Sequence, residues 1–245
     1  MTQVHHALQP LVQPAFHNNQ FSILVSDQIN LLTHAYIVVI GVAFTTSLLS
    51  FKLDYPIHLR LFSLLIGVTF IVEFSAYFIV RWFHLRTNLP LYNIFMLVEF
   101  TTYAIYYCII IRSSIHKKII LSFVILYPLF WLISVFLIFG LSNWNSYIII
   151  TGSLFTIYTS VAYYHQLITE VELVKLRYNP EFWIATGLIV FYTCNLPYVG
   201  MLNYLIKNHL AIARQLLVLL QILVILMYSI FTYAFLCQMI MKKSS

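Results

Sequence analysis

The chain contains seven long runs of mostly apolar residues, separated by short polar segments. A helix that crosses the hydrocarbon core of a bilayer needs about 20 such residues, because the core is ~30 Å thick and each helical residue rises ~1.5 Å. Transmembrane β-strands instead alternate over about 10 residues, so these runs are not those of a β-barrel. The runs lie near residues 31–51, 59–83, 91–112, 119–140, 147–169, 181–206 and 215–241. The pattern predicts an all-α polytopic membrane protein with seven transmembrane helices.

The composition agrees with a chain surrounded by membrane lipids. Hydrophobic residues make up 62% of the 245 residues, and only 8% are charged, whereas soluble domains carry about 25% charged residues. The net charge of +6 does not indicate nucleic-acid binding, because the 13 Lys and Arg residues stand singly or in pairs between the apolar runs. Basic residues flank membrane spans in this way.

The short connections and the distribution of basic residues predict the topology. Tight connections favour antiparallel neighbours and hence an up-down bundle. The loops after the first, third and fifth runs, with the C-terminus, hold nine Lys and Arg residues, and the opposite side holds four. Because the more basic side stays in the cytoplasm, we expect the N-terminus outside and the C-terminus inside. Residues 1–30 would then form an extracytoplasmic tail, 31–241 the transmembrane domain, and 242–245 a cytoplasmic tail.

Motifs for cofactor or metal chemistry are missing from the sequence. Cys108, Cys194 and Cys237 fall inside apolar runs without metal-ligand spacing, as small buried apolar residues do. The seventh run has no lysine that could carry retinal, and no Gly-rich phosphate loop or hydrolase motif occurs. We therefore expect no cofactor, no bound metal and no catalytic residue, although whether the chain is an enzyme stays open.

Two acidic residues lie where charge is costly. Glu73 is midway along the second run and Glu99 midway along the third. A carboxylate at the centre of a membrane helix costs ~2.5–3.5 kcal/mol on insertion scales. Counting outward from a turn near Thr87 predicts that both acids lie at one depth and face the bundle. Tyr77 shares a helical face with Glu73, and Tyr103 shares one with Glu99.

The sixth and seventh runs add further polar candidates. Pro197 lacks an amide proton and should kink its helix, so that Asn195, two residues earlier, lines a cavity. Tyr228 of the seventh run faces the same interior. The predicted ligand or proton pocket comprises Glu73, Glu99, Tyr77, Tyr103, Asn195 and Tyr228. The alternative is a structural hydrogen-bond network that holds the helices together.

Two segments resemble a family of small, uncharacterised seven-helix inner-membrane proteins of Bacteroidota. Residues 90–100 read PLYNIFMLVEF, and residues 181–195 read EFWIATGLIVFYTCN. Glu73 matches an acid expected in the second span of that family. The resemblance implies a multi-pass protein of a bacterial inner (cytoplasmic) membrane with the seven-helix layout, and it implies no activity.

Three functions are compatible with these features. The first is a non-enzymatic sensory or accessory module, in which the polar pocket receives an unknown small ligand or proton and the bundle signals through a membrane protein partner. The second is a proton-coupled transporter or channel, against which the lack of an internal repeat speaks. The third is an intramembrane lipid hydrolase with the two acids as general acid and base.

Overall fold

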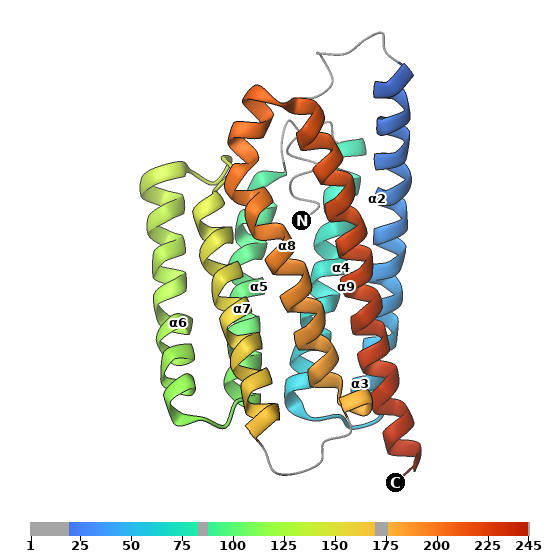
Figure 1. The fold of residues 1–245 in the computed structure, drawn as a ribbon, viewed down its shortest axis with the longest axis vertical. Helices are drawn as coiled ribbons and strands as arrows, with labels where there is room; N and C mark the ends of the chain where they lie inside the picture. Colours follow the sequence, from blue (N-terminus) through green and yellow to red (C-terminus); the bar gives the residue numbers. More distant parts are fainter. Residues whose placement is uncertain (1–19, 83–87, 170–175, 245) are drawn as a thin grey trace.

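The computed structural model describes residues 20–82, 88–169 and 176–244, and within these ranges all regular structure is helical. The N-terminal tail up to residue 19 lies outside the described residues. The elements run lengthwise through the molecule (Figure 1). They are α2 (Gln20–Ser47), α3 (Leu49–Lys52), α4 (Ile57–Trp82), α5 (Leu89–Ile110), α6 (Ser114–Ile133), the π-helix η1 (Ser134–Phe139), α7 (Ser146–Thr169), the 3₁₀ turn η2 (Leu176–Tyr178), α8 (Pro180–Asn208) and α9 (Leu210–Ser244).

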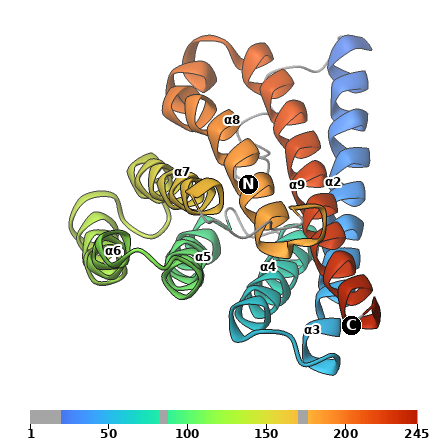
Figure 2. The ribbon, with the colours of Figure 1, turned by 60° about the horizontal axis from the view of Figure 1, so that its bottom comes forward.

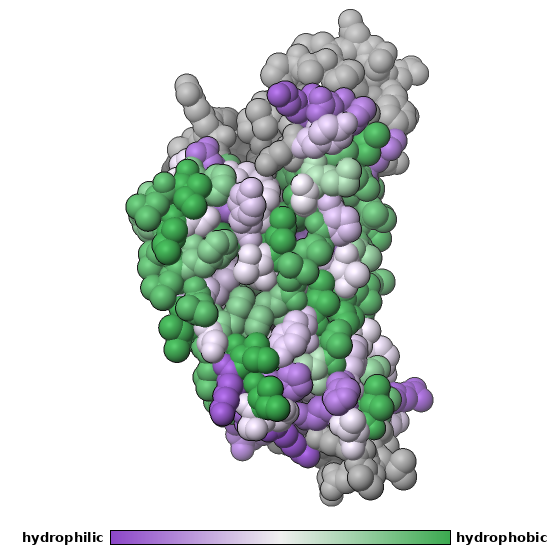
Figure 3. Space-filling view, turned by 60° about the vertical axis from the view of Figure 1, so that its left-hand side comes forward, coloured by the Kyte–Doolittle hydropathy of each residue, from purple (hydrophilic) through white to green (hydrophobic). Residues whose placement is uncertain are grey.

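Seven of these helical segments are long and apolar enough to cross a membrane, as the sequence predicts. They lie at Leu31–Lys52, Ile57–Phe78, Leu89–Ile110, Ser114–Phe139, Ser146–Thr169, Pro180–Leu202 and Gln215–Ile240. Figure 3 shows the matching surface on one face, where apolar side chains form a broad band and hydrophilic side chains gather toward the two ends. The described chain therefore has the form of a multi-pass membrane protein.

Six of the long helices form a closed ring. Going round the ring, α2 packs on α4, α4 on α5, α5 on α7, α7 on α8, α8 on α9, and α9 on α2. The helices alternate in direction along the chain, so the α2–α9 and α5–α7 contacts join parallel helices and close the ring. Figure 2 shows α6 apart from the others, on the outer side of α5 and α7. The bundle is thus a six-helix ring with one outer helix.

The outer helix α6 is fixed to the ring by a tryptophan. The indole Nε1 of Trp131 donates to the backbone oxygen of Asn93 on α5 at 2.7 Å. α6 contains Pro128 and continues as the π-helix η1, which ends at Gly140 with φ of +81°. A π-turn supplies an irregular end to a helix, and glycine takes this left-handed conformation at no steric cost.

At the opposite end of the bundle, polar contacts join α4 and the turn before it to α8 and α9. His58 Nε2 and Glu181 Oε1 are 2.6 Å apart, which joins the first turn of α4 to the first turn of α8. The α3–α4 turn places Asp54 at φ of +52°, and the buried Tyr55 that follows donates to the backbone oxygen of Phe235 at 3.4 Å. These contacts connect helices across this end of the ring.

Several helices extend beyond the apolar runs that predicted them. α2 begins at Gln20, inside the segment expected to be an extracytoplasmic tail, and α6 begins at Ser114, inside an expected loop. The expected loop 207–214 is almost entirely helical, with only His209 between α8 and α9. The reason is that apolar runs mark the part of a helix that meets lipid, whereas backbone hydrogen bonding continues through polar residues beyond it.

Candidate functional site

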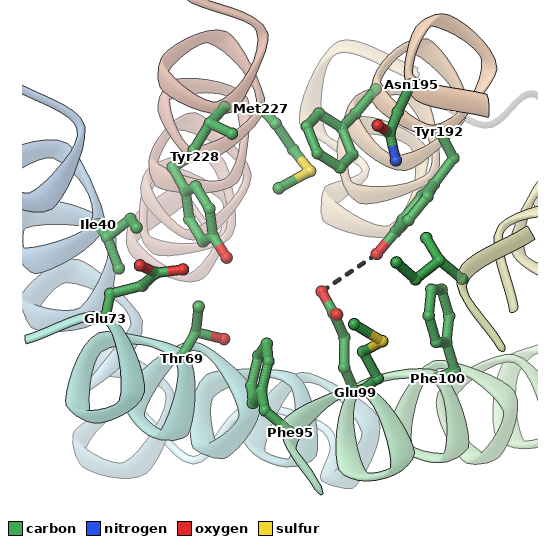
Figure 4. Close-up of a pocket in the computed structure, with 14 residues that line it drawn as sticks. Ile40, Thr69, Glu73, Phe95, Glu99, Phe100, Tyr192, Asn195, Met227 and Tyr228 are labelled. Carbon is green, nitrogen blue, oxygen red and sulfur yellow. Dashed lines mark hydrogen bonds between the residues drawn. The ribbon is translucent and has the colours of Figure 1, made fainter. Parts of the chain in front are cut away.

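A cavity of about 40 Å³ lies inside the ring, and all six ring helices contribute to its wall. By the same measure a buried water needs ~10–15 Å³, so the space suits about three water-sized groups. Figure 4 shows the side chains that surround it. They are Ile40, Thr69, Glu73, Phe95, Met96, Glu99, Phe100, Ile149, Phe191, Tyr192, Asn195, Val224, Met227 and Tyr228.

Glu99 of α5 is held by two tyrosines. The hydroxyl of Tyr103, one turn further along α5, donates to Glu99 Oε1 at 3.3 Å. The hydroxyl of Tyr192, on α8, donates to the same oxygen at 3.1 Å, and Figure 4 shows this bond. Among the described residues, these two hydrogen bonds occupy Oε1 and leave Oε2 for a further donor. The side chain is therefore oriented from two helices and still has acceptor capacity.

Glu73 of α4 is almost fully buried, with 3% of its surface exposed. The hydroxyl of Tyr92 on α5 donates to Glu73 Oε2 at 3.1 Å. Thr69, one turn earlier on α4, lines the cavity between this acid and Tyr228 of α9 (Figure 4). Each acid is thus bonded by a tyrosine from another helix, which lowers the cost of holding a carboxyl inside the bundle.

The two carboxyls face one cavity but stand at different depths. Glu73 bonds Tyr92, which lies seven residues before Glu99 on α5, or about two helical turns of ~5.4 Å each. In Figure 4, Thr69 and Phe95 lie between the two acids. The sequence expectation of equal depth is therefore not met, because counting from a turn assumes that both helices start level.

Asn195 of α8 is fully buried on the wall of the cavity, and neither its amide oxygen nor its amide nitrogen has a hydrogen-bond partner among the described residues. A buried polar group without a partner costs about 1–3 kcal/mol, and such groups are rare in native proteins. The helix does not use this amide, and Figure 4 shows it beside Tyr192 at the edge of the open space. Asn195 is the clearest sign that the cavity is built for an occupant.

Most of the residues predicted for the pocket come together. The cavity is lined by Glu73, Glu99, Asn195 and Tyr228. Tyr103 is not among the lining residues, but its hydroxyl donates a hydrogen bond to Glu99.

Tyr77 lies elsewhere. Its hydroxyl is 3.2 Å from Nε2 of His34 on α2, and it is not among the cavity-lining residues. Two helical turns separate Tyr77 from Thr69, so the shared face that the sequence suggested leads out of the cavity.

Tyr192 is the main residue that the pocket prediction omitted. It stands three residues before Asn195, which places both on one face of α8. That spacing is a signal that the sequence contained. Its link to Glu99 spans 93 positions, and no local pattern indicates which helix it would meet.

The row of small hydroxyl residues on α7 serves packing. Thr156 donates to the backbone oxygen of Gly152, and Ser160 donates to that of Thr156. The hydroxyls of Ser160 and Tyr107 are 2.7 Å apart and join α7 to α5. Such residues let helices approach closely.

Comparison of the chain with protein-family models, with curated proteins and with solved structures gave no match.

Proposed function

We propose that this chain is a non-enzymatic sensory or accessory module of a membrane, whose cavity receives a small ligand or protons and whose bundle passes the resulting change to a membrane partner. One observation carries the proposal: residues from every helix of the closed ring line the cavity. One of them, Asn195, has a side-chain amide without a hydrogen-bond partner among the described residues. Because packed helices respond to a change of volume or charge between them, an occupant here bears on six helices at once.

The environment of the acids favours binding over catalysis. Glu73 is 3% exposed and bonded by Tyr92, and Glu99 is bonded by two tyrosines. A hydrolase of lipids needs room for a water and an ester beside its acid and base, and about 40 Å³ holds about three water-sized groups. The same volume suits a compact ligand or a few waters.

We also propose which membrane holds the chain and on which side each terminus lies. The excess of basic residues on one side supports an N-terminus outside and a C-terminus in the cytoplasm. The resemblance to inner-membrane proteins of Bacteroidota supports a bacterial cytoplasmic membrane.

We expect α8 to move when the cavity takes up a ligand or protons. Cys194 is exposed on the outside of α8, next to the buried Asn195. In a background with Cys108→Ser and Cys237→Ala, an environment-sensitive fluorophore on Cys194 reports this movement. Its emission in nanodiscs should change when the pH is varied, because a proton taken up by the cavity changes the charge between the ring helices.

Two controls make the experiment specific. The double variant Glu73→Gln, Glu99→Gln should remove the response while the protein keeps its helical circular dichroism and monodisperse elution. A fluorophore on Leu129→Cys of α6, outside the ring, should respond weakly in both backgrounds. Equal responses of the Cys194 label with and without the two acids would contradict the proposal. Flux of protons through proteoliposomes that depends on either acid would instead support a transporter.

A further inference from the structure

The cavity wall is unbalanced in charge. Its described lining contains two carboxyl groups and no Lys, Arg or His. Inside a bundle, an uncompensated carboxylate costs several kcal/mol, so such groups are neutralised by a proton or by a positive partner. The protein supplies tyrosine hydroxyls to Glu73 and Glu99 but no cation among the lining residues. The described residues of the wall therefore supply no positive charge to the two acids.

We propose that the ligand of this cavity is a small ammonium cation, of the size and chemistry of methylammonium. This inference rests on the proposed function, because it names the ligand class for the same cavity. The volume of about 40 Å³ suits about three water-sized groups, which admits methylammonium or ethylammonium and excludes bulky quaternary ammonium ions.

The hydrogen-bonding groups match an ammonium group. A primary ammonium carries three N–H donors and needs acceptors. Glu99 keeps Oε2 for a donor, and the amide oxygen of Asn195 has no partner among the described residues. The hydroxyl of Tyr228 points toward the space between the two acids in Figure 4. One cation bound here would neutralise Glu99 and satisfy Asn195 together, which removes two costs of the empty site.

The aromatic residues of the wall suit the same ligand. Phe95, Phe100 and Tyr192 surround Glu99 in Figure 4, and the rings of Phe100 and Tyr192 are 5.6 Å apart between centroids. Ring faces attract organic ammonium ions, and they provide apolar contact for a methyl group. Most of the remaining wall is aliphatic or thioether.

A metal ion fits less well. Metal ions need several ligand atoms converging on one point at ~2.0–2.6 Å. Glu73 bonds Tyr92, which lies two helical turns before Glu99 on α5, so the two carboxyls do not converge on one point. Among the residues that the structure describes, no group of three or more His, Cys, Asp or Glu gathers.

The test is a titration of the full-length purified protein in nanodiscs with methylammonium chloride, followed by calorimetry and by thermal unfolding at constant ionic strength. We expect saturable binding and a rise in Tm. Sodium chloride and tetraethylammonium chloride, the metal and size controls, should give neither. Equal effects of sodium, or the absence of saturable methylammonium binding, would overturn the inference.

Variants locate the site. Glu99→Gln and Asn195→Leu should each weaken methylammonium binding about thirtyfold or more, the loss typical when one partner of a buried charged contact is removed. Tyr77→Phe, on α4 but outside the cavity wall, should bind as the natural protein does. If Glu99→Gln does not fold, Asn195→Leu decides alone. Unchanged binding by Asn195→Leu would place the cation elsewhere and contradict the inference.

The Cys194 label separates this inference from the proposed function. A label that responds to pH while methylammonium does not bind supports the sensory module and refutes the ligand class. Saturable methylammonium binding that leaves the label unchanged, in the ligand titration and in the pH titration alike, supports the ligand class and refutes the sensory module.

Discussion

The hydroxyl of Tyr192 donates to Glu99 Oε1 at 3.1 Å and joins α8 to α5 across the cavity. One turn further along α8, the amide of Asn195 has no partner among the described residues. The same helix thus satisfies one polar group of the cavity and leaves another open. The Tyr192–Glu99 hydrogen bond therefore holds two helices together, whereas the Asn195 amide is available to a ligand.

Replacing Tyr192 by Phe should destabilise the bundle modestly. The substitution removes one donor from Glu99 while Tyr103 still bonds the same oxygen. Hydrogen bonds between membrane helices contribute ~0.6 kcal/mol on average and up to ~1.7 kcal/mol, so the loss should fall in that range. Reversible unfolding in mixed micelles measures it. A double-mutant cycle with Tyr103→Phe should show coupling between the two tyrosines, and strict additivity would mean that Glu99 does not connect them.

Replacing Gly152 by Ala should strain the contact between α7 and α5. A Cβ atom at Gly152 would clash with Cγ of Phe100, whose ring lines the cavity. Overpacking of this kind costs about 1–3 kcal/mol, and the displaced ring should narrow the cavity.

Gly200→Ala is the matched control for this prediction, since a Cβ there meets nothing within 4 Å. It should be neutral or slightly stabilising, because Ala favours a helix by about 1 kcal/mol over Gly. Thermal unfolding of both variants checks the pair. Equal effects at the two sites would show that helix propensity outweighs the ring contact.

Replacing Trp131 by Phe should loosen α6 and leave the ring intact. The substitution removes the 2.7 Å bond from Nε1 to the backbone oxygen of Asn93, which is worth about 1 kcal/mol. Hydrogen exchange in nanodiscs should rise in α6 and stay unchanged in α8 and α9. Phe130→Leu on the same helix, at an exposed position, is the control. Equal loosening of α8 would contradict the separation of α6 from the ring.

The sequence predicted the seven spans because continuous apolar runs are a strong and local signal. It also predicted four of the cavity-lining residues, since acids and an amide inside apolar runs are costly unless they face the interior. It did not predict which helices close the ring. The α5–α7 and α2–α9 contacts depend on side-chain fit between distant segments. Tyr77 illustrates the limit, because one helical face can begin in the cavity at Thr69 and leave it two turns later.

The central claim is that Asn195 is kept for a ligand at a cost in stability. The most direct test is the free energy of unfolding of Asn195→Leu, measured with and without methylammonium beside the natural protein. Without methylammonium the variant should be more stable by about 1–3 kcal/mol, because a side chain of similar size replaces an unsatisfied amide. Methylammonium should stabilise the natural protein and leave the variant unchanged. A variant less stable than the natural protein would show that the amide holds the fold together, and the account of the cavity would be wrong.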